Sequence, residues 1–163
     1  MERLANLEIH KEEFSFSAGH FTIFSATERE HLHGHNYAVS ISFNLKIEHN
    51  GLSFDYRHYK KIIHTLCDSL DRRFLLPAYS PYLKLEDKED NCLAWFNHKL
   101  LTFPKDDVVI LPLSNITIEE LSYWFLQKIL ENQTEIHQHL IESITVKVYN
   151  NHQQSAGATW SKI

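Results

Sequence analysis

The sequence predicts an α+β fold built around an antiparallel sheet, on three observations. Two long stretches near the start alternate apolar with polar residues, two later stretches repeat apolar residues at helical spacing, and the chain closes on further alternating segments. The predicted order is therefore two strands, a helix, an inserted segment, a second helix and two strands. With 163 residues, 43% of them hydrophobic, we expect one domain over residues 1–163 with an insertion at about 79–111.

The first two strands are predicted from alternation with a period of two. Phe14, Phe16 and Ala18 alternate with polar or small residues, and His20 continues their apolar face. In the second stretch one face runs through alternate residues from His33 to Leu45, most of them apolar. We expect these two strands to pair through the intervening loop.

The two helices are predicted from apolar residues spaced three and four apart. The first runs from about Tyr56 to about Leu70, with Cys67 beside its apolar stripe. The second begins at Thr117 and ends near Asn132. Its start has the pattern of a capping box, in which the Thr117 hydroxyl caps the helix and Glu120 reaches back.

The remaining segments are predicted to be extended. Leu83 to Leu111 contains short apolar runs around an Asn97–Lys99 turn, which favours an inserted hairpin followed by an extended piece. Ile144 to Tyr149 alternates as a strand, and a short last strand is expected around Ala158 to Ile163.

Composition excludes several classes of partner and site. The 16 basic and 21 acidic residues give a formal charge of -5, without the basic excess of a nucleic-acid-binding protein. Cys67 and Cys92 lie 25 positions apart without C-x-x-C spacing, so neither a disulfide framework nor a thiolate zinc site is expected. Without a signal-like or membrane-spanning apolar run, we expect a cytoplasmic protein with no membrane partner.

Histidines form the most informative pattern in the sequence. His33 and His35 are two residues apart on a predicted strand, so their imidazoles leave the same face and can converge on one ion. His20, at the end of the neighbouring strand, is the best placed third ligand. Three imidazoles with one open position are typical of a catalytic zinc site. The alternative is that these are incidental surface histidines in a chain that contains 12.

The same residues carry a resemblance to a known family. Phe16-Ser17-Ala18-Gly19-His20 and His33-Gly34-His35-Asn36-Tyr37 resemble the zinc motif of the 6-pyruvoyltetrahydropterin and 6-carboxytetrahydropterin synthases. The similarity continues in family order at Asp55-Tyr56, Leu70-Asp71, Thr117-Ile118-Glu119 and Val146-Lys147-Val148-Tyr149.

This resemblance implies the tunnelling fold, a four-stranded antiparallel sheet with two helices on one face. It also implies Zn²⁺ held by His20, His33 and His35, a small pterin-like substrate and lyase chemistry on its side chain. Family members form trimers that stack into hexamers, so we expect a homo-oligomer with active sites at subunit boundaries. Thr117, Glu119 and Asn150 would meet the zinc strands of another chain there.

Three chemistry-bearing positions depart from the family pattern. No cysteine lies between His20 and His33, and Arg29 stands where the bacterial enzymes have their base. Glu30 resembles the glutamate of a variant branch that yields 6-hydroxymethyldihydropterin, so Glu30 is the candidate base. Partial burial would raise its pKa toward neutrality. The alternative is a solvated charged loop.

The other two departures concern proton relay and substrate binding. The family's leucine-aspartate-histidine element is Leu70-Asp71-Arg72 here, which keeps Asp71 as a catalytic candidate and makes Arg72 a candidate phosphate ligand. Asn150 replaces the glutamate that grips the pterin, so the charge-assisted part of that grip is lost.

Three functions remain open on these residues. The chain is a zinc-dependent pterin lyase, a zinc-binding paralogue that has lost or changed its activity, or a noncatalytic assembly protein with a fourth protein ligand on the metal. The preserved histidines favour the first function. Folate, biopterin and queuosine synthesis all remain open as the pathway.

Overall fold

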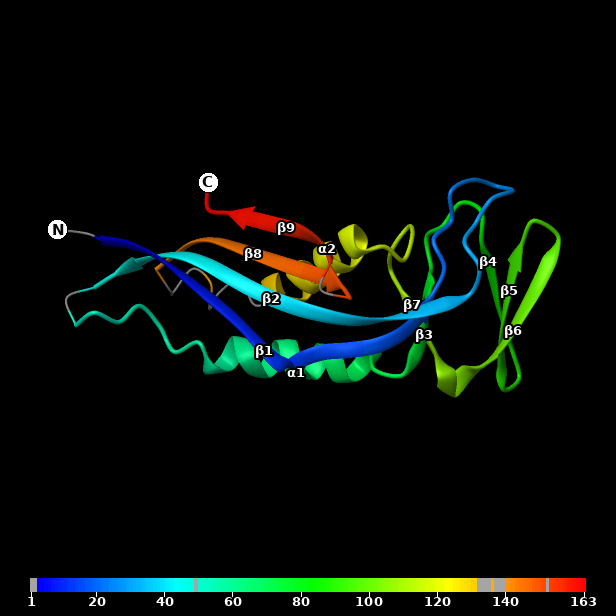
Figure 1. Cartoon of the computed structure of the whole chain (residues 1–163), viewed down its shortest axis with the longest axis horizontal. Helices are drawn as coiled ribbons and strands as arrows, with labels where there is room; N and C mark the ends of the chain where they lie inside the picture. Colours follow the sequence, from blue (N-terminus) through cyan, green and yellow to red (C-terminus); the bar gives the residue numbers. More distant parts are fainter. Residues whose placement is uncertain (1–2, 49, 132–135, 137–139, 152) are drawn as a thin grey trace.

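In the computed structural model, the described residues are 3–48, 50–131, 136, 140–151 and 153–163. Figure 1 shows an elongated molecule with a long twisted sheet, helices along one face and a small separate sheet at one end. The chain runs through β1 (Arg3–His20), β2 (His33–Ile47), α1 (Arg57–Leu70), β3 (Arg73–Pro77), β4 (Lys84–Lys88), β5 (Asn91–Phe96), β6 (Lys99–Pro104), the 3-10 helix η1 (Lys105–Asp107), β7 (Val108–Leu111), α2 (Ile118–Leu130), β8 (Ile141–Asn150) and β9 (Gln154–Ser161).

The main sheet has six strands in the order β7-β3-β1-β2-β8-β9. Its central pairs β1–β2 and β2–β8, and the β8–β9 hairpin, are antiparallel as predicted. A wholly antiparallel four-stranded sheet is nevertheless wrong, because β3 pairs in parallel with β1, and β7 pairs in parallel with β3. These parallel neighbours follow long crossovers, which local alternation does not reveal.

Both helices lie over the apolar face of this sheet and share one core with it. Helix α1 packs on β1, and α2 packs on β8 and β9. The predicted apolar faces are confirmed: alternate residues of β2 from Tyr37 to Leu45 are buried. Each such side chain contributes about 1.5–3 kcal/mol by leaving water.

Strand β1 contains an irregularity that exchanges its faces. His10 pairs with Ser40 and Ser15 pairs with Ala38, so four residues of β1 lie opposite one residue of β2. The excess of three is odd, and side chains alternate with a period of two. The buried residues are therefore odd-numbered before the irregularity, as at Ile9, and even-numbered after it, as at Phe16.

The insertion forms a second small sheet, β4-β5-β6, with its own core. Asn97 and His98 both have positive φ, which confirms the predicted turn between β5 and β6. With three strands, the sheet of the insertion has one strand more than the predicted hairpin. Seven residues of this second core are buried: Phe21, Ile23, Leu76, Leu83, Cys92, Ala94 and Phe96.

Helix α2 begins as predicted, with one difference at its cap. The Thr117 hydroxyl accepts a hydrogen bond from the Glu120 backbone N–H at 3.3 Å. The Glu120 carboxylate accepts from the backbone N–H and hydroxyl of Ser114, both at 3.2 Å, so the reciprocal half of the capping box is wrong. The predicted helix end at Asn132 lies outside the described residues. None of the described helices is long and apolar enough to cross a membrane.

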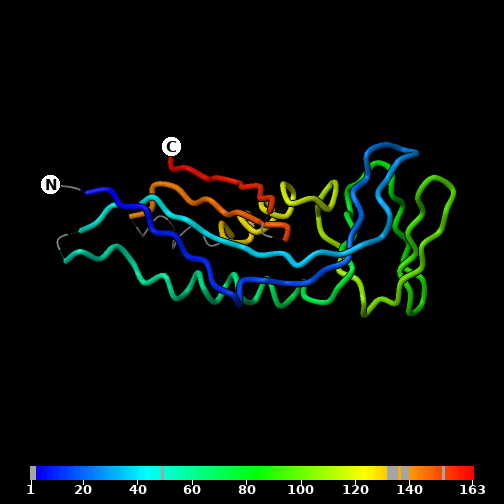
Figure 2. The backbone as a smooth tube through the Cα atoms, viewed as in Figure 1, coloured from blue at the N-terminus to red at the C-terminus, as the bar shows by residue number. Residues whose placement is uncertain are grey.

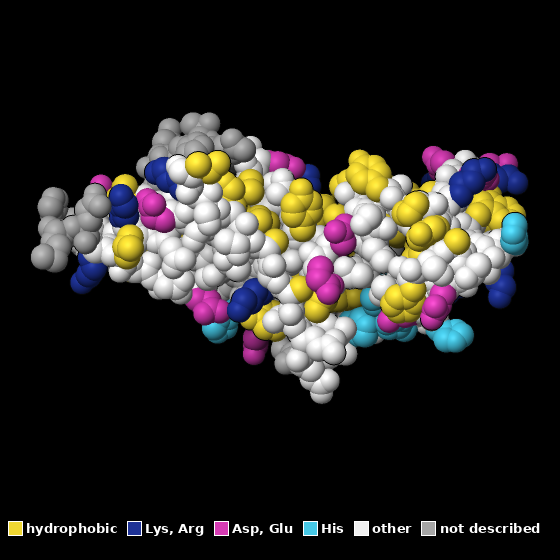
Figure 3. Space-filling model, turned by 90° about the horizontal axis from the view of Figure 1, so that it is seen from above, with side chains coloured by type: hydrophobic (Ala, Val, Ile, Leu, Met, Phe, Trp, Pro, Cys, Tyr) yellow, Lys and Arg dark blue, Asp and Glu magenta, His cyan; other side chains and the backbone are white. Residues whose placement is uncertain are grey.

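Charge on the surface agrees with the composition. On the face drawn in Figure 3, basic and acidic side chains are interspersed, without a continuous basic stripe.

Candidate metal centre

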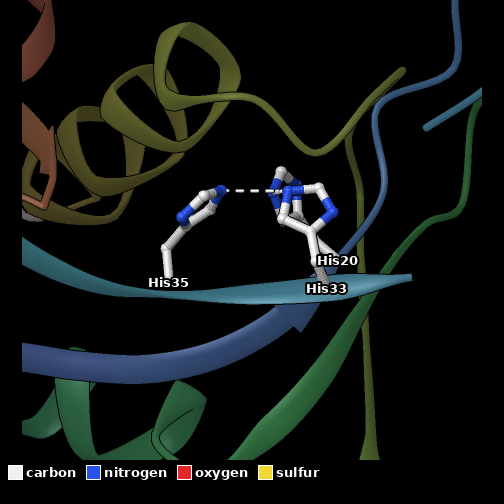
Figure 4. A group of neighbouring side chains, drawn as sticks. All are labelled: His20, His33 and His35. Atoms are coloured by element: carbon white, nitrogen blue, oxygen red, sulfur yellow. Dashed lines mark hydrogen bonds between the residues drawn. The ribbon is translucent and has the colours of Figure 1, made fainter. Parts of the chain in front are cut away.

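Three histidines converge where β1 ends and β2 begins. His20 and His33 are direct antiparallel partners, and His35 pairs with Ala18. Figure 4 shows the three rings facing one another, with His33 and His35 rising side by side from β2. The His33 Nε2 atom lies 3.1 Å from His20 Nε2 and 3.0 Å from His35 Nε2.

The other nitrogen of each ring contacts a polar group of the protein. His20 Nδ1 lies 2.9 Å from the Ile116 carbonyl oxygen, just before α2. His33 Nδ1 lies 2.7 Å from the carbonyl oxygen of His31. Carbonyl acceptors require a proton on Nδ1, which leaves the Nε2 lone pair free for a metal. His35 Nδ1 lies 3.3 Å from Nδ2 of the Asn151 side chain.

This geometry fits a zinc ion. Ligands about 2.05 Å from a tetrahedral zinc lie about 3.3 Å apart, close to the observed separations between Nε2 atoms. Burial lowers the pKa of His20, with the two neighbouring imidazoles adding to the effect and the Ile116 carbonyl opposing it. Burial and His33 likewise lower the pKa of His35. The lowered pKa values of His20 and His35 favour their neutral forms, as metal binding requires.

The cluster leaves one coordination position open on the protein side. Among the described residues, the group of donor side chains lying mutually within 4.8 Å consists of His20, His33 and His35. A structural zinc site would be closed by a fourth protein ligand. The cluster therefore matches a catalytic site better than a structural one.

Glu30 lies beside the open side of this cluster. Its Oε2 atom is 3.8 Å from His33 Nε2 and accepts a hydrogen bond from the Thr22 backbone N–H at 2.8 Å. Burial raises the pKa of Glu30, but the Thr22 hydrogen bonds and the charges of His20 and His33 outweigh it and lower the pKa. The expected rise toward neutrality is therefore wrong. The lowered pKa favours the ionised form of Glu30, and the Thr22 backbone N–H holds its carboxylate.

Asp71 and Arg72 directly follow the last residue of α1. Asp71 Oδ1 accepts a hydrogen bond from the Ser17 backbone N–H at 2.9 Å, and Asp71 Oδ2 lies 3.3 Å from Arg72 Nε. The Arg72 side chain is 87% exposed. It lines a hollow of about 580 Å³ together with Arg73, Gly34 and His35. This places an arginine pair near the back of the metal cluster.

A larger hollow of about 920 Å³ lies further along the sheet. Its lining includes Ser17, Asn36, Asp71 and Tyr149. None of the three clustered histidines is among its described lining residues. The smaller hollow, by contrast, includes His35 among its lining residues.

Besides Arg72, three residues were proposed to bind substrate, and they occupy separate places in this chain. Thr117 caps α2, directly after the carbonyl that holds His20. Glu119 is the second residue of the helix and is exposed. Asn150 ends β8 opposite Tyr37, and its Oδ1 atom is buried without a hydrogen-bond partner among the described groups. An unpaired buried oxygen is costly unless a ligand donates to it.

Two neighbouring asparagines were missed by the sequence analysis. Asn151 contacts His35, and its φ of 48° places it in the tight turn between β8 and β9. Asn115 bonds both the N–H and the carbonyl of Ile23, which ties the loop after β1 to the start of α2. Asparagine is common in turns between strands, so the predicted turn after β8 could have pointed to Asn151. Nothing in the sequence pointed to Asn115.

The two thiols do not take part in the cluster. Burial raises the pKa of Cys67 to about 12, with Asp68 and Asp71 adding to the effect. Cys92 lies in β5, and burial raises its pKa as well. Neither thiol resembles an activated base.

Comparison with known proteins decides the family. The family pattern described as 6-pyruvoyl tetrahydropterin synthase matches residues 8–159. The chain belongs to this family. Its fold is the tunnelling fold of the family, here with the mixed six-stranded sheet and the small three-stranded sheet. Its three clustered histidines are consistent with the zinc site of these synthases.

Relatives of this pterin synthase family member come from archaea and from malaria parasites. A candidate 6-carboxy-5,6,7,8-tetrahydropterin synthase of Pyrococcus horikoshii is 27% identical over 90% of this chain and 86% of its own length. The 6-pyruvoyltetrahydropterin synthase of Plasmodium vivax is 29% identical, with a TM-score of 0.92 over 98% of this chain and 99% of that one. A variant of it, in which a glutamate described as a catalytic residue is replaced by alanine, is 28% identical with the same TM-score.

Proposed function

We propose that this protein is a zinc-dependent lyase that cleaves the side chain of dihydroneopterin triphosphate or a related dihydropterin, with 6-hydroxymethyldihydropterin as the product. One observation carries the proposal: a carboxylate, Glu30, lies 3.8 Å from an open cluster of three imidazole Nε2 atoms. A metal that polarises a substrate oxygen and a base that removes its proton would then act on the same atom.

His20, His33 and His35 would hold the zinc ion, which supplies Lewis-acid polarisation of a side-chain hydroxyl. Glu30 Oε2 accepts the proton of the hydroxyl on the second side-chain carbon. The bond between the first and second carbons then breaks, a carbonyl forms on the second carbon, and its electron pair passes to the first carbon and the pterin ring. Glu30 returns its proton to the first carbon, which leaves a hydroxymethyl group.

The remaining proposed residues recognise the two ends of the substrate. The buried Asn150 Oδ1, unpaired among the described groups, can accept from an amino-pyrimidine N–H, a weaker grip than a carboxylate would give. Thr117 and Glu119 at the start of α2 complete the pterin pocket. Arg72 binds phosphate, and Asp71 serves as a second proton carrier.

We propose that these groups meet across the boundaries of a trimer or hexamer. Within one chain, the described lining of the hollow that contains His35 and Arg72 does not include Thr117, Glu119 or Asn150. A neighbouring copy would bring them together and cover the exposed edge of β9. Light scattering should therefore give a mass of three or six chains.

The parasite relatives support the glutamate as the base. The Plasmodium vivax synthase has a catalytic glutamate, and this chain has a glutamate rather than a cysteine in the loop before His33. The archaeal relatives are named for 6-carboxytetrahydropterin formation, and that reaction is a further outcome to be assayed.

Product analysis with purified protein tests the proposal. The zinc-loaded protein is incubated with dihydroneopterin triphosphate, and products are oxidised and separated by chromatography with fluorescence detection. We expect 6-hydroxymethylpterin from the wild type and none from His33→Ala. A product with three side-chain carbons would indicate 6-pyruvoyl chemistry instead.

The second candidate function is a zinc-binding paralogue without synthase activity. Arg72 and Asn150 favour it, because they replace a titratable histidine and a pterin-binding carboxylate. Zinc bound at one ion per chain, with every dihydropterin left unchanged, would establish this candidate and refute the lyase.

A further inference from the structure

Arg29, which directly precedes Glu30, lies between two aromatic rings. Its guanidinium carbon is 4.9 Å from the centre of the Phe21 ring and 5.6 Å from the centre of the Phe96 ring. Both phenylalanines are buried, at 1% and 4% exposure. A cation between two buried ring faces is held by electrostatic attraction and by exclusion of water.

The same guanidinium also contacts the backbone of Glu30. Arg29 Nη1 donates a hydrogen bond to the Glu30 carbonyl oxygen at 2.7 Å. Arginine can do both because its planar fork stacks on rings while its N–H groups point outward in the plane. Lysine offers a point charge without this combination.

The two rings come from distant parts of the chain. Phe21 directly follows His20, whereas Phe96 ends β5 of the inserted three-stranded sheet. Both belong to the second core, which joins the loop after β1 to the insertion. Figures 1 and 2 show this loop beside the small sheet at one end of the molecule.

Two further hydrogen bonds and a short bridge fix the segment that carries Glu30. The Glu30 backbone N–H donates to the Thr22 carbonyl at 2.9 Å, and the Thr22 N–H donates to the Glu30 carboxylate at 2.8 Å. Ile23 and Arg29 form an antiparallel bridge. Arg29 thus holds the carbonyl side of Glu30, while Thr22 holds its amide and its carboxylate.

We propose that Arg29 is a positioning residue for Glu30, and that the inserted sheet takes part in the active site by supplying Phe96 as one face of the arginine clamp. The clamp consists of Arg29, Phe21 and Phe96. It keeps the Glu30 carboxylate beside the histidine cluster. The effect of the clamp on turnover rests on the proposed function, whereas its effect on the position of Glu30 does not.

Hydrogen exchange tests the clamp without any substrate. The probes are the backbone amides of Thr22 and Glu30, both of which are bonded within this segment. We expect Arg29→Met to speed their exchange about tenfold or more, Phe96→Leu about threefold, and Arg29→Lys by an amount between wild type and Arg29→Met. Amides of β2 and β8 report whether the fold is intact.

A matched control comes from another cation over a ring. Lys60, in α1, has its Nζ 4.5 Å from the centre of the ring of Tyr56, which directly precedes the helix. Lys60→Met should leave exchange at Thr22 and Glu30 unchanged. Exchange within twofold of wild type in both Arg29→Met and Phe96→Leu would overturn the proposal. If Arg29→Met does not fold, Phe96→Leu decides alone.

Turnover then separates positioning from general stability. We expect Arg29→Met to lower kcat about ten- to a hundredfold with KM within threefold, and to change kcat less than twofold when Glu30 is already glutamine. An equal fall in both backgrounds would show that Arg29 does not act through Glu30 and would overturn the proposal. An inactive wild type would refute the proposed function, and the exchange data would still decide on the clamp.

Discussion

Replacing Glu30 by glutamine removes a base while preserving most of its contacts. The amide oxygen of glutamine can still accept from the Thr22 N–H, which lies 2.8 Å from the present carboxylate. The loss of charge in that bond should cost about 1 kcal/mol of stability. A positioned general base contributes about 10²–10⁴ in rate, or roughly 2.7–5.5 kcal/mol of transition-state free energy. The effect on turnover should therefore far exceed the effect on stability.

The assay measures turnover of dihydroneopterin triphosphate together with metal content and thermal unfolding. We expect Glu30→Gln to lower kcat by about two to four orders of magnitude, with about one zinc per chain retained, because all three imidazoles remain. The matched control is a variant in which both Cys67 and Cys92 are replaced by serine. It should keep its turnover, since neither thiol lies in the cluster.

Two results would refute this reasoning. Turnover of Glu30→Gln within threefold of wild type would show that another group takes the proton. Loss of activity in the cysteine variant alone would show that a thiol, rather than Glu30, is the base.

Three more predictions concern single side chains, two in the metal cluster and one in the core. The zinc content of His33→Ala, measured by mass spectrometry of the metal after dialysis, should fall from about one ion per chain to near none. The reason is that His33 Nε2 lies within 3.1 Å of both other ligand atoms. Full retention of zinc would contradict the assignment. The Cys67 thiol, with its pKa raised to about 12 from 9.0, should react with a disulfide reagent at pH 8 roughly a thousandfold more slowly in the folded protein than in denaturant; rapid labelling of the native protein would contradict this. For the metal-free protein, burial holds the pKa of His20 below its ordinary 6.5, so below about pH 6.5 the unfolded chain binds a proton that the folded chain does not. Its unfolding midpoint in urea should therefore fall as pH drops from 7 to 5, and His20→Gln should fall less steeply; equal slopes would show that other groups cause the effect.

The central strands and the metal cluster could be predicted because short-range rules determine them. Alternation places His33 and His35 on the same face as Tyr37, and a simple return of the chain sets His20 opposite His33. The helix at Thr117 was predicted for a similar reason, since its hydroxyl meets an N–H only three residues away. All these inferences need only neighbours along the chain or across one hairpin.

The missed features depend on partners far apart in sequence. The parallel strand β3 is apolar and short, so its register against β1 depends on where α1 ends rather than on its own pattern. In the sequence, Arg29 belongs to a charged run, and nothing there indicates that Phe96, 67 positions later, lies against it. The pKa of Glu30 was expected to rise with burial because the bond from Thr22, across a loop turn, does not show in the spacing.

The irregularity in β1 between His10 and Ser15 determines how the residue count along the strand relates to the face on which His20 lies. The face exchange occurs because the excess of β1 residues there is three, an odd number. Deleting one residue from 11–13 would leave an excess of two, and the former His20, now an odd-numbered residue, would lie on the same face as Ile9 by simple alternation. A single-codon deletion in this stretch should therefore leave zinc binding close to that of the wild type, whereas the loss of a ligand histidine should abolish it. Substitutions at the same exposed positions should be tolerated.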